Sequence, residues 1–220
     1  MADRTPKLTI LCDFDGTITP SDLTDFIYEK FAGCGLYYLK LWSQYLIDTR
    51  EEILRTFETI TASQEEIAAA LTSIPIDPTF YELVTFSRQN DIELVIVSDG
   101  LDWAIETVLG AHGIQGLPII SNHMVFGENK LTCEFPWYDP LTPMAGVCKP
   151  LVVRHYQQKD GLVIYIGDGR SDQDAVMEAD LVFAKDALAV YCQEHKIPAL
   201  SFTDFSDICS QIAQWLTDHL

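Results

Sequence analysis

The stretch LTILCDFDGTIT, residues 8–19, decides the fold, because it begins as an apolar run and then places Asp13 and Asp15 one residue apart. A short apolar run rich in β-branched residues is typical of a strand buried within a parallel sheet. Side chains two residues apart on a strand point to the same face, so both carboxylates would lie together at the strand's end. Such a pair has one raised pKa unless a cation lies nearby, and Mg²⁺, which prefers oxygen ligands, would remove the conflict. Gly16 allows a tight turn out of the strand, and the Thr17 hydroxyl can bind that turn or an anion.

Further apolar runs and amphipathic segments follow along the chain. The other predicted strands are 92–97, 161–166 and 181–184, and the predicted helices are 79–90, 101–112, 150–158, 171–179, 186–195 and 204–218. Strands that alternate with helices indicate an α/β fold with a mostly parallel sheet flanked by helices. Ligands of such sheets bind beyond the carboxyl ends of the strands, so the polar residues at these ends are the candidates for function.

Residues 19–76 interrupt this alternation with four successive helical segments. Ser21 and Ser63 are the expected N-cap residues of the first and last of them, and Ser63 with Glu66 has the pattern of a capping box. A block of helices inserted after the first strand of an α/β sheet predicts a module that covers the functional edge of that sheet.

The resulting domain prediction is a core domain formed by 1–18 and 77–220, with a helical-bundle cap domain at 19–76. Within the core, the segment 121–137 has alternating stretches on either side of a Gly-Glu-Asn turn, which predicts a small β-hairpin. No internal repeat or low-complexity tract is visible.

Two later segments place residues that can bind phosphate, Ser98 and Lys149, near the carboxyl ends of the predicted strands. In IVSDG, residues 96–100, the hydroxyl of Ser98 and the amides after it would face the N-terminus of the next helix, a natural phosphate site. Lys149 directly precedes Pro150, which suits the first position of a helix, so the ammonium would lie at a helix entrance. Each signal alone is weak, since Ser-Asp-Gly is a common turn and a single lysine is usually a surface charge.

The segment IGDGRSDQDA, residues 166–175, adds two more carboxylates. Asp168 would end a strand, and Asp172 follows four residues later. The Gly-Asp-Gly turn lets the backbone approach a ligand closely. Asp168 therefore suits direct metal ligation, and Asp172 suits either ligation or the orientation of a ligand.

The charge balance restricts the partners. The 220 residues include 14 basic and 33 acidic ones, a net charge of −19, and such a chain repels nucleic acid and anionic membranes. An anionic small molecule would need a local cationic pocket or a metal ion. Six scattered cysteines without a C-x-x-C pair, and the lack of a secretory signal or an apolar run of membrane-spanning length, favour a reduced, cytoplasmic location.

Taken in order, these motifs resemble the haloacid dehalogenase-like (HAD) phosphatase superfamily. The motifs are DFDGT, the strand-end serine, the lysine at a helix start and GDGRSD, and the resemblance spans the whole chain. The helical insert after the first motif is similar to the phosphoserine phosphatase-like subgroup. DFDGTIT, CKP, GDGRSD and DLVFAKDAL also resemble the bacterial phosphatases of methionine salvage, which act on 2-hydroxy-3-keto-5-methylthiopentenyl-1-phosphate. The resemblance implies a Rossmann-like core and a Mg²⁺-dependent phosphomonoester hydrolase.

The resemblance also implies roles for the four aspartates. Asp13 would be the nucleophile that forms an aspartyl-phosphate, and Asp15 the general acid and then the general base. Mg²⁺ would be held by the carboxylate of Asp13, the main-chain carbonyl of Asp15 and the carboxylate of Asp168. Asp172 would complete the metal site by orienting a water molecule on the ion.

The phosphate group of the substrate would contact Thr17, Ser98, Asp99 and Lys149. One position departs from the family pattern, because many members have glycine where this chain has Asp99. Its amide suffices for binding phosphate. Its carboxylate would either face the pocket, which disfavours acidic substrates, or point away as a helix N-cap, which is the reading we favour.

Substrate choice would lie in the cap, whose aromatic residues we expect mainly in the cap core, with one or two facing an apolar substrate tail. They are Phe26, Tyr28, Phe31, Tyr37, Tyr38, Trp42 and Tyr45. Arg50 and Arg55 are candidates for binding a substrate carboxylate, although pairing with nearby glutamates is the simpler role.

Several functional alternatives stay open on the sequence alone. We expect a small phosphate ester as the substrate. The methylthiopentenyl phosphate of methionine salvage is the first candidate, and phosphoserine is the second. A phosphotransferase would pass the phosphoryl group to an alcohol instead of water, and a non-catalytic module would only bind a phosphate ligand. The chain is expected to act as a monomer or a homodimer.

Overall fold

The computed structural model describes residues 7–127, 131–159 and 161–219. Its strands form a sheet in the order β4-β3-β2-β1-β5-β6-β7. Neighbouring strands are parallel from β2 through β1, β5 and β6 to β7, and β3 and β4 are antiparallel. The strands are β1 (Lys7–Cys12), β2 (Glu93–Leu101), β3 (Ile119–Phe126), β4 (Leu131–Glu134), β5 (Gly161–Gly167), β6 (Leu181–Ala184) and β7 (Leu200–Ser201). The predicted α/β class with a mostly parallel sheet is confirmed.

The chain divides into two compact units, and the first consists of the described residues of Met1–Ile18, Ile76–Val97 and Lys149–Leu220. In this unit β1 is central, since Ile10 pairs with Leu94 of β2 and with Ile164 of β5. Both neighbours bury apolar side chains, which explains the uninterrupted apolar runs. The helices of the unit are α5 (Phe80–Gln89), α7 (Lys149–Gln157), α8 (Asp186–His195) and α9 (Phe205–His219).

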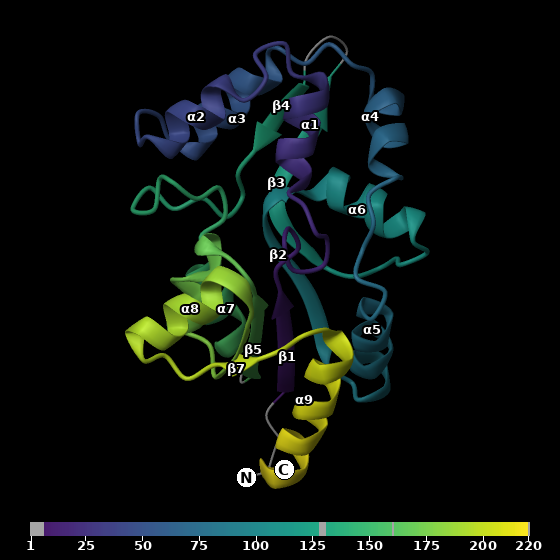
Figure 1. Ribbon diagram of the computed structural model, residues 1–220, viewed down its shortest axis with the longest axis vertical. Coiled ribbons are helices and arrows are strands. Elements are labelled where there is room, and N and C mark those ends of the chain that lie inside the picture. Colours follow the sequence, from purple (N-terminus) through teal and green to yellow (C-terminus); the bar gives the residue numbers. More distant parts are fainter. Residues whose placement is uncertain (1–6, 128–130, 160, 220) are drawn as a thin grey trace. The chain divides into compact units, whose positions relative to one another are not determined.

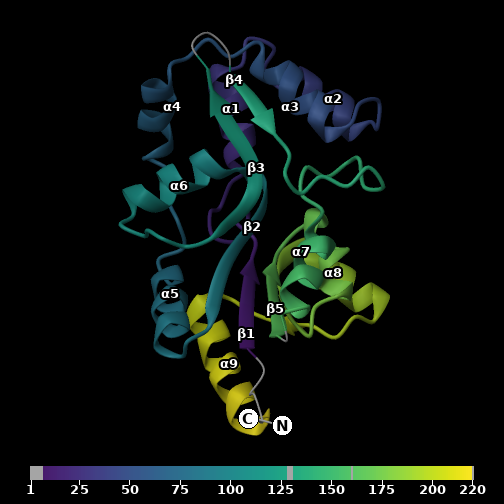
Figure 2. The same ribbon diagram turned by 180° about the vertical axis from the view of Figure 1, so that it is seen from behind.

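The helices of the first unit lie on both sides of its strands. In both views β1 lies between the pair α5 and α9 and the helices α7 and α8 (Figures 1 and 2). The rings of Phe80 and Phe205 meet edge to face between α5 and α9, with centroids 5.1 Å apart. Polar residues follow the ends of β1, β5 and β6, namely Asp13, Asp168 and Lys185.

One predicted helix of this unit, 171–179, is wrong. The structure has two short 3₁₀ turns there, η1 (Arg170–Asp172) and η2 (Ala175–Met177). The carboxylate of Asp172 accepts the amides of Asp168 and Gly169, which holds this stretch in a tight loop. Aspartate competes with helix formation in this way because its side chain satisfies backbone donors locally.

The second unit consists of Thr19–Pro75 and the described residues of Ser98–Cys148. Its helices are α1 (Leu23–Phe31), α2 (Tyr37–Ser43), α3 (Thr49–Phe57), α4 (Gln64–Leu71) and α6 (Asp102–Ala111). The four predicted helices of 19–76 are therefore present. This unit also contains 98–148, and the assignment of 19–76 alone as a cap domain stays a prediction.

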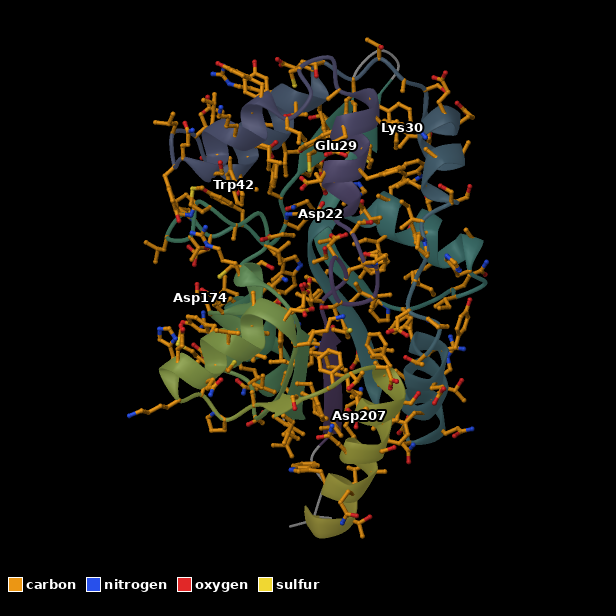
Figure 3. All side chains as sticks on the ribbon, in the orientation of Figure 1. Asp22, Glu29, Lys30, Trp42, Asp174 and Asp207 are labelled. Carbon is orange, nitrogen blue, oxygen red and sulfur yellow. The ribbon has the colours of Figure 1, made fainter. Side chains whose placement is uncertain are left out.

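The local signals of the second unit are mostly as expected. Ser63 and Glu66 form the predicted capping box at the start of α4. The N-cap of α1 is Asp22, labelled in Figure 3, and not Ser21, because the Asp22 side chain accepts the amide of Asp25. The antiparallel pair β3 and β4 confirms the hairpin, whereas most of its predicted turn lies at 128–130, outside the described residues.

The aromatic residues of 19–76 are less buried than predicted. Of the seven named above, only Tyr28 is fully buried, and Tyr37 and Tyr45 are exposed by 57% and 61%. The reason is α2, which buries none of its side chains, although the Trp42 indole (Figure 3) donates a hydrogen bond to Thr49. Arg55 forms a surface ion pair with Glu51, which is the simpler of the two roles predicted for it.

A buried carboxylate lies inside the second unit, on α3. Glu52 is only 4% exposed, and it accepts hydrogen bonds from the hydroxyls of Tyr28 and Thr56. Burial raises the pKa of Glu52 to about 7, and the charges of Asp22 and Asp25 act in the same direction. The folded chain therefore binds a proton here that the unfolded chain releases.

Glu52→Gln should make the free energy of unfolding less dependent on pH. The unfolded group ionises near pH 4.5 and the folded group near pH 7, so wild-type stability falls between these values and stays low above them. The loss from this group is about 3 kcal/mol at most. Urea unfolding at pH 5 and pH 8 measures it, with Glu58→Gln, at the exposed C-terminal end of α3, as control. Equal pH dependence in wild type and Glu52→Gln would contradict this assignment.

The described helices include none with the length and apolar character needed to cross a membrane. All six cysteines are free thiols, four of them buried, as expected for small apolar core residues.

Candidate active site

Asp13 follows β1 directly and continues its line. Its amide donates to the carbonyl of Ile166 on β5 at 2.9 Å, so the backbone stays in the sheet one residue beyond the strand. The residue is 4% exposed. Burial raises the pKa of Asp13, the nearby carboxylate of Asp172 raises it further, and Lys149 opposes both effects.

Lys149 is the cation of this cluster. It is the first residue of α7, next to Pro150, and its side chain is almost completely buried. Its ammonium lies 2.8 Å from Oδ1 of Asp13 and 2.6 Å from Oδ1 of Asp172, and it also donates to the hydroxyl of Ser171 at 2.9 Å. All three donor hydrogens of the ammonium thus have an acceptor, which offsets the cost of burying the charge.

Asp172 holds that lysine in place through hydrogen bonds. Its Oδ1 accepts the Lys149 ammonium and also the phenol of Tyr165, at 2.7 Å. Its Oδ2 accepts the amides of Asp168 and Gly169 at 3.1 and 3.0 Å. Four donors on one fully buried carboxylate fix its orientation, and through it the position of Lys149.

Asp168 lies at the end of β5, beside the turn that follows Asp13. Its Oδ1 accepts the Thr17 hydroxyl at 2.7 Å, and Thr17 is buried. The main-chain carbonyl of Thr17 accepts the ammonium of Lys185 at 3.3 Å. Burial raises the pKa of Asp168, while the Thr17 hydroxyl and Lys185 lower it. In this arrangement the Thr17 hydroxyl holds a carboxylate, and its role as a phosphate ligand stays a prediction.

Three of the four predicted metal ligands come together. Oxygen atoms of Asp13, Asp168 and Asp172 all lie within 4.8 Å of one another. Such a group of carboxylates fits a hard divalent cation, Mg²⁺ above all, because that ion prefers oxygen ligands. Asp172 already has four hydrogen-bond donors, so Asp13 and Asp168 are the better placed to bind an ion directly. Asp15, half-buried in the turn, adds its negative charge beside Asp13.

Ser98 and Asp99 belong to the second unit, where the end of β2 is anchored. Ser98 is buried, and its Oγ accepts the amide of Gly100 at 2.9 Å. The expected N-cap role of Asp99 is wrong, because Leu101 is the N-cap of α6 and the Asp99 carboxylate instead accepts the amide of Val147. The predicted phosphate contacts of Ser98 and Asp99 stay predictions.

Sequence reasoning missed Tyr165, Ser171 and Lys185 as parts of this cluster. Tyr165 is a hydroxyl-bearing side chain in an otherwise apolar strand run, a signal that could have been used. Lys185 directly follows β6, so the rule of polar residues at strand ends applied to it as well. Ser171 carried no usable signal.

Gly16→Ala should cost most of the activity. Gly16 has φ of +79°, and a Cβ there would lie 2.3 Å from Oδ2 of Asp168. The variant would therefore displace that carboxylate, besides adding about 1 kcal/mol of backbone strain. Hydrolysis of an aryl phosphate and Mg²⁺ affinity are the measurements.

Gly113→Ala is the matched control for Gly16→Ala, since its φ is +73° and no atom lies within 4 Å of the added Cβ. It should lose some stability and keep its activity. Equal activity of the two variants would show that the Asp168 contact has no bearing on function.

The family of the chain follows from comparison with known proteins. A model of the haloacid dehalogenase-like hydrolases matches residues 10–176, which contain every predicted site residue. The chain belongs to this family. Several curated relatives of the chain are named as phosphatases, and the protein is an enzyme of that class.

Several similar curated proteins share one name. A 2-hydroxy-3-keto-5-methylthiopentenyl-1-phosphate phosphatase of Brevibacillus brevis is 32% identical over 214 residues, which cover 94% of this chain and 96% of the relative. The protein of the same name in Bacillus cereus strain B4264 is 30% identical over 216 residues, with the same coverage. A bifunctional enzyme MtnB/MtnX of Bacillus licheniformis is 30% identical, and the match spans 52% of its length.

Solved structures confirm the fold. A substrate-bound phosphoserine phosphatase complex superposes with a TM-score of 0.70 at 17% identity. A phospho-aspartyl intermediate analogue of phosphoserine phosphatase gives a TM-score of 0.68 at 18% identity. Each covers 94% of this chain and 99% of the other, so the likeness extends over nearly the full length of both chains.

Proposed function

We propose that this protein is a Mg²⁺-dependent phosphatase that hydrolyses 2-hydroxy-3-keto-5-methylthiopentenyl-1-phosphate in methionine salvage. The observation that carries the proposal is the near-full-length similarity to several curated phosphatases of that name. The buried cluster around Asp13 supports it, because it supplies a nucleophile, a fixed cation and a group of carboxylates that fits a metal ion. The same similarity favours a cytoplasmic enzyme whose partner is a small phosphate ester.

The chemistry requires an attack by Asp13 on phosphorus. A carboxylate oxygen of Asp13 forms the new P–O bond while the bond to the ester oxygen breaks, and Asp15 gives that oxygen its proton. Water then attacks the phosphorus of the aspartyl-phosphate and gives its proton to Asp15. The bond between the Asp13 oxygen and phosphorus breaks, inorganic phosphate leaves, Asp13 is again a carboxylate and Asp15 again carries its proton.

Asp13 can act only when it is ionised. Burial and Asp172 favour its neutral form, so a nearby positive charge is needed to keep the carboxylate reactive. Lys149 supplies one such charge at 2.8 Å. Asp13, Asp168 and the main-chain carbonyl of Asp15 would hold Mg²⁺. The ion would add positive charge that neutralises the phosphoryl oxygens in the transition state.

The overall acidity of the chain is consistent with a site at which Lys149 and a metal ion supply the positive charge. A net charge of −19 does not attract an anionic ester, so positive charge must be concentrated at the site itself. Lys149 and a bound cation would provide that concentration. Thr17, Ser98, the amide of Asp99 and Lys149 would bind the phosphoryl oxygens, and Asp172 would keep Lys149 in place.

The test is a kinetic comparison of phosphate esters at fixed Mg²⁺. The methylthiopentenyl phosphate should give a kcat/KM at least about 100-fold above that of phosphoserine, since a correct substrate pocket discriminates by this much or more. EDTA should remove activity, and Mg²⁺ should restore it. A preference for phosphoserine, or no hydrolysis of the methylthio ester, would refute the substrate assignment.

Transfer to an alcohol is separated from hydrolysis by product analysis. With glycerol or ethanol present, a hydrolase releases inorganic phosphate in equal amount to the ester consumed. Accumulation of a new phosphate ester would identify a phosphotransferase instead. Failure to turn over any ester in a broad panel would identify a binding module.

A further inference from the structure

The end of β2 is tied to two other segments of the second unit through a single residue, Asp99. The main-chain carbonyl of Asp99 accepts a hydrogen bond from Nδ2 of Asn122 on β3, at 2.6 Å. Its side-chain Oδ1 accepts the amide of Val147, at 2.7 Å. Asp99 therefore joins three stretches that are far apart in the sequence, one of which leads directly into the helix that begins with Lys149.

Asn122 is held rigidly in this arrangement. It is fully buried, and a Cβ on Gly146 would lie 2.5 Å from its Nδ2, so the amide packs directly against the backbone of that glycine. Its Oδ1 has no hydrogen-bond partner among the described residues, which is costly for a buried oxygen. The bond that Asn122 does form, from its Nδ2 to the carbonyl of Asp99, holds the end of β2 in place.

The other side of Asp99 bears on Lys149. Val147 is buried and precedes Lys149 by two residues, so its backbone sets where the lysine begins. A carboxylate that accepts this amide is stronger as an acceptor than a neutral group would be.

We propose that Asp99 is a positioning residue that couples the phosphate-binding end of β2 to the segment that delivers Lys149. The inference rests on the proposed phosphate-binding role of Ser98 and Lys149, and goes beyond it by giving the side chain of Asp99 a task of its own. The carboxylate acts through Val147 and does not touch the substrate. Asp99 thereby does by a hydrogen bond what glycine, common at this position in the family, cannot do.

Three variants at one position test the proposal. Asp99→Asn keeps an oxygen that can accept the Val147 amide, whereas Asp99→Ala and Asp99→Gly remove it. Asp99→Gly introduces the residue that the family pattern has there, so it should fold. Steady-state kinetics with an aryl phosphate, and the inhibition constant of inorganic phosphate, are measured at saturating Mg²⁺.

Asp99→Ala and Asp99→Gly should raise both KM and the inhibition constant of inorganic phosphate about tenfold, the scale of one lost hydrogen bond to a charged group. Asp99→Asn should restore both constants to within about threefold of wild type. The exposed Glu106→Ala, on α6 of the same unit, controls for the loss of a carboxylate and should change neither constant.

Two results would overturn the proposal. Wild-type constants in Asp99→Gly would show that the carboxylate has no positioning role. Asp99→Asn as impaired as Asp99→Gly would show that an oxygen acceptor for the Val147 amide does not restore binding, which contradicts the positioning role. Because aryl phosphate and inorganic phosphate report on the phosphate subsite alone, these outcomes are independent of which metabolite is the substrate.

Discussion

Asp13→Asn should abolish hydrolysis of phosphate esters while the chain still folds. An amide oxygen is a poor nucleophile toward phosphorus, so kcat should fall by about 10⁴-fold or more, the scale seen when the nucleophile of a covalent enzyme is removed. The fold should survive, because the amide oxygen can still accept the Lys149 ammonium. Lys149 would then balance Asp172 alone, which removes one buried negative charge from the cluster. Release of phosphate from an aryl ester measures the activity, and thermal unfolding measures the fold.

Asp15→Asn is the informative companion to Asp13→Asn. It removes the proposed acid and base but keeps the nucleophile, so an ester with a good leaving group should still phosphorylate the chain, and hydrolysis of that adduct should be slow. Acid quenching followed by mass spectrometry should find the phosphoryl group on Asp13 in Asp15→Asn and on no residue in Asp13→Asn. Residual kcat above about 1% of wild type in Asp13→Asn would exclude Asp13 as the nucleophile.

Lys149→Met should have the second largest effect, and it should reach both activity and stability. Methionine has a similar length but no charge, so Asp13 and Asp172 would remain buried without their shared cation. Removing one partner of a buried ion pair costs about 3–5 kcal/mol, and loss of the phosphate-binding charge should lower kcat/KM by at least about 10³-fold.

The stability of Lys149→Met should depend on pH because the substitution leaves the buried carboxylate of Asp13 without its cation. Lys149 lowers the pKa of Asp13, so its removal raises that pKa further. The folded variant then keeps a proton where the unfolded chain has lost it, and its stability should fall as pH rises above about 4. Urea unfolding from pH 4 to pH 8 measures this trend. Lys159→Met, an exposed lysine just after α7, is the control and should change neither activity nor stability; an equal pH dependence in both variants would contradict the buried pairing.

The sequence predicted β1, β5 and β6 of the first unit well because their buried side chains leave an uninterrupted apolar run, whereas β7, whose two residues are exposed, was not predicted. β6, at Leu181–Ala184, matches the predicted residues, and β1 and β5 differ from prediction by one residue each. The prediction of a helix at 171–179 was wrong because hydrogen bonds of a side chain, and not apolar burial, determine the local structure there. The Asp172 side chain accepts the amides of Asp168 and Gly169, just before the predicted helix, and hydropathy does not register such bonds.

The site residues divide in the same way. Asp13, Asp168 and Lys149 could be found because strand ends and helix starts are visible in the sequence, and the sheet brings them together. The contact between Tyr165 and Asp172, by contrast, depends on how a tight loop folds back under its own strand. The bond from Asn122 to Asp99 depends on the pairing of β3 with the end of β2, which no local pattern encodes.

The central position of β1 has a consequence for how the enzyme is made. Its partner β5 lies in the last third of the chain, and the amide of Asp13 meets its acceptor, Ile166, only when that strand has been synthesised. At about 5–20 residues per second, the apolar strand waits on the order of 10 s on the ribosome before it can pair on that side. Contacts so distant in sequence fold slowly. A nascent chain that ends before Asp172 lacks part of the carboxylate cluster, so catalysis cannot begin until that segment has been synthesised.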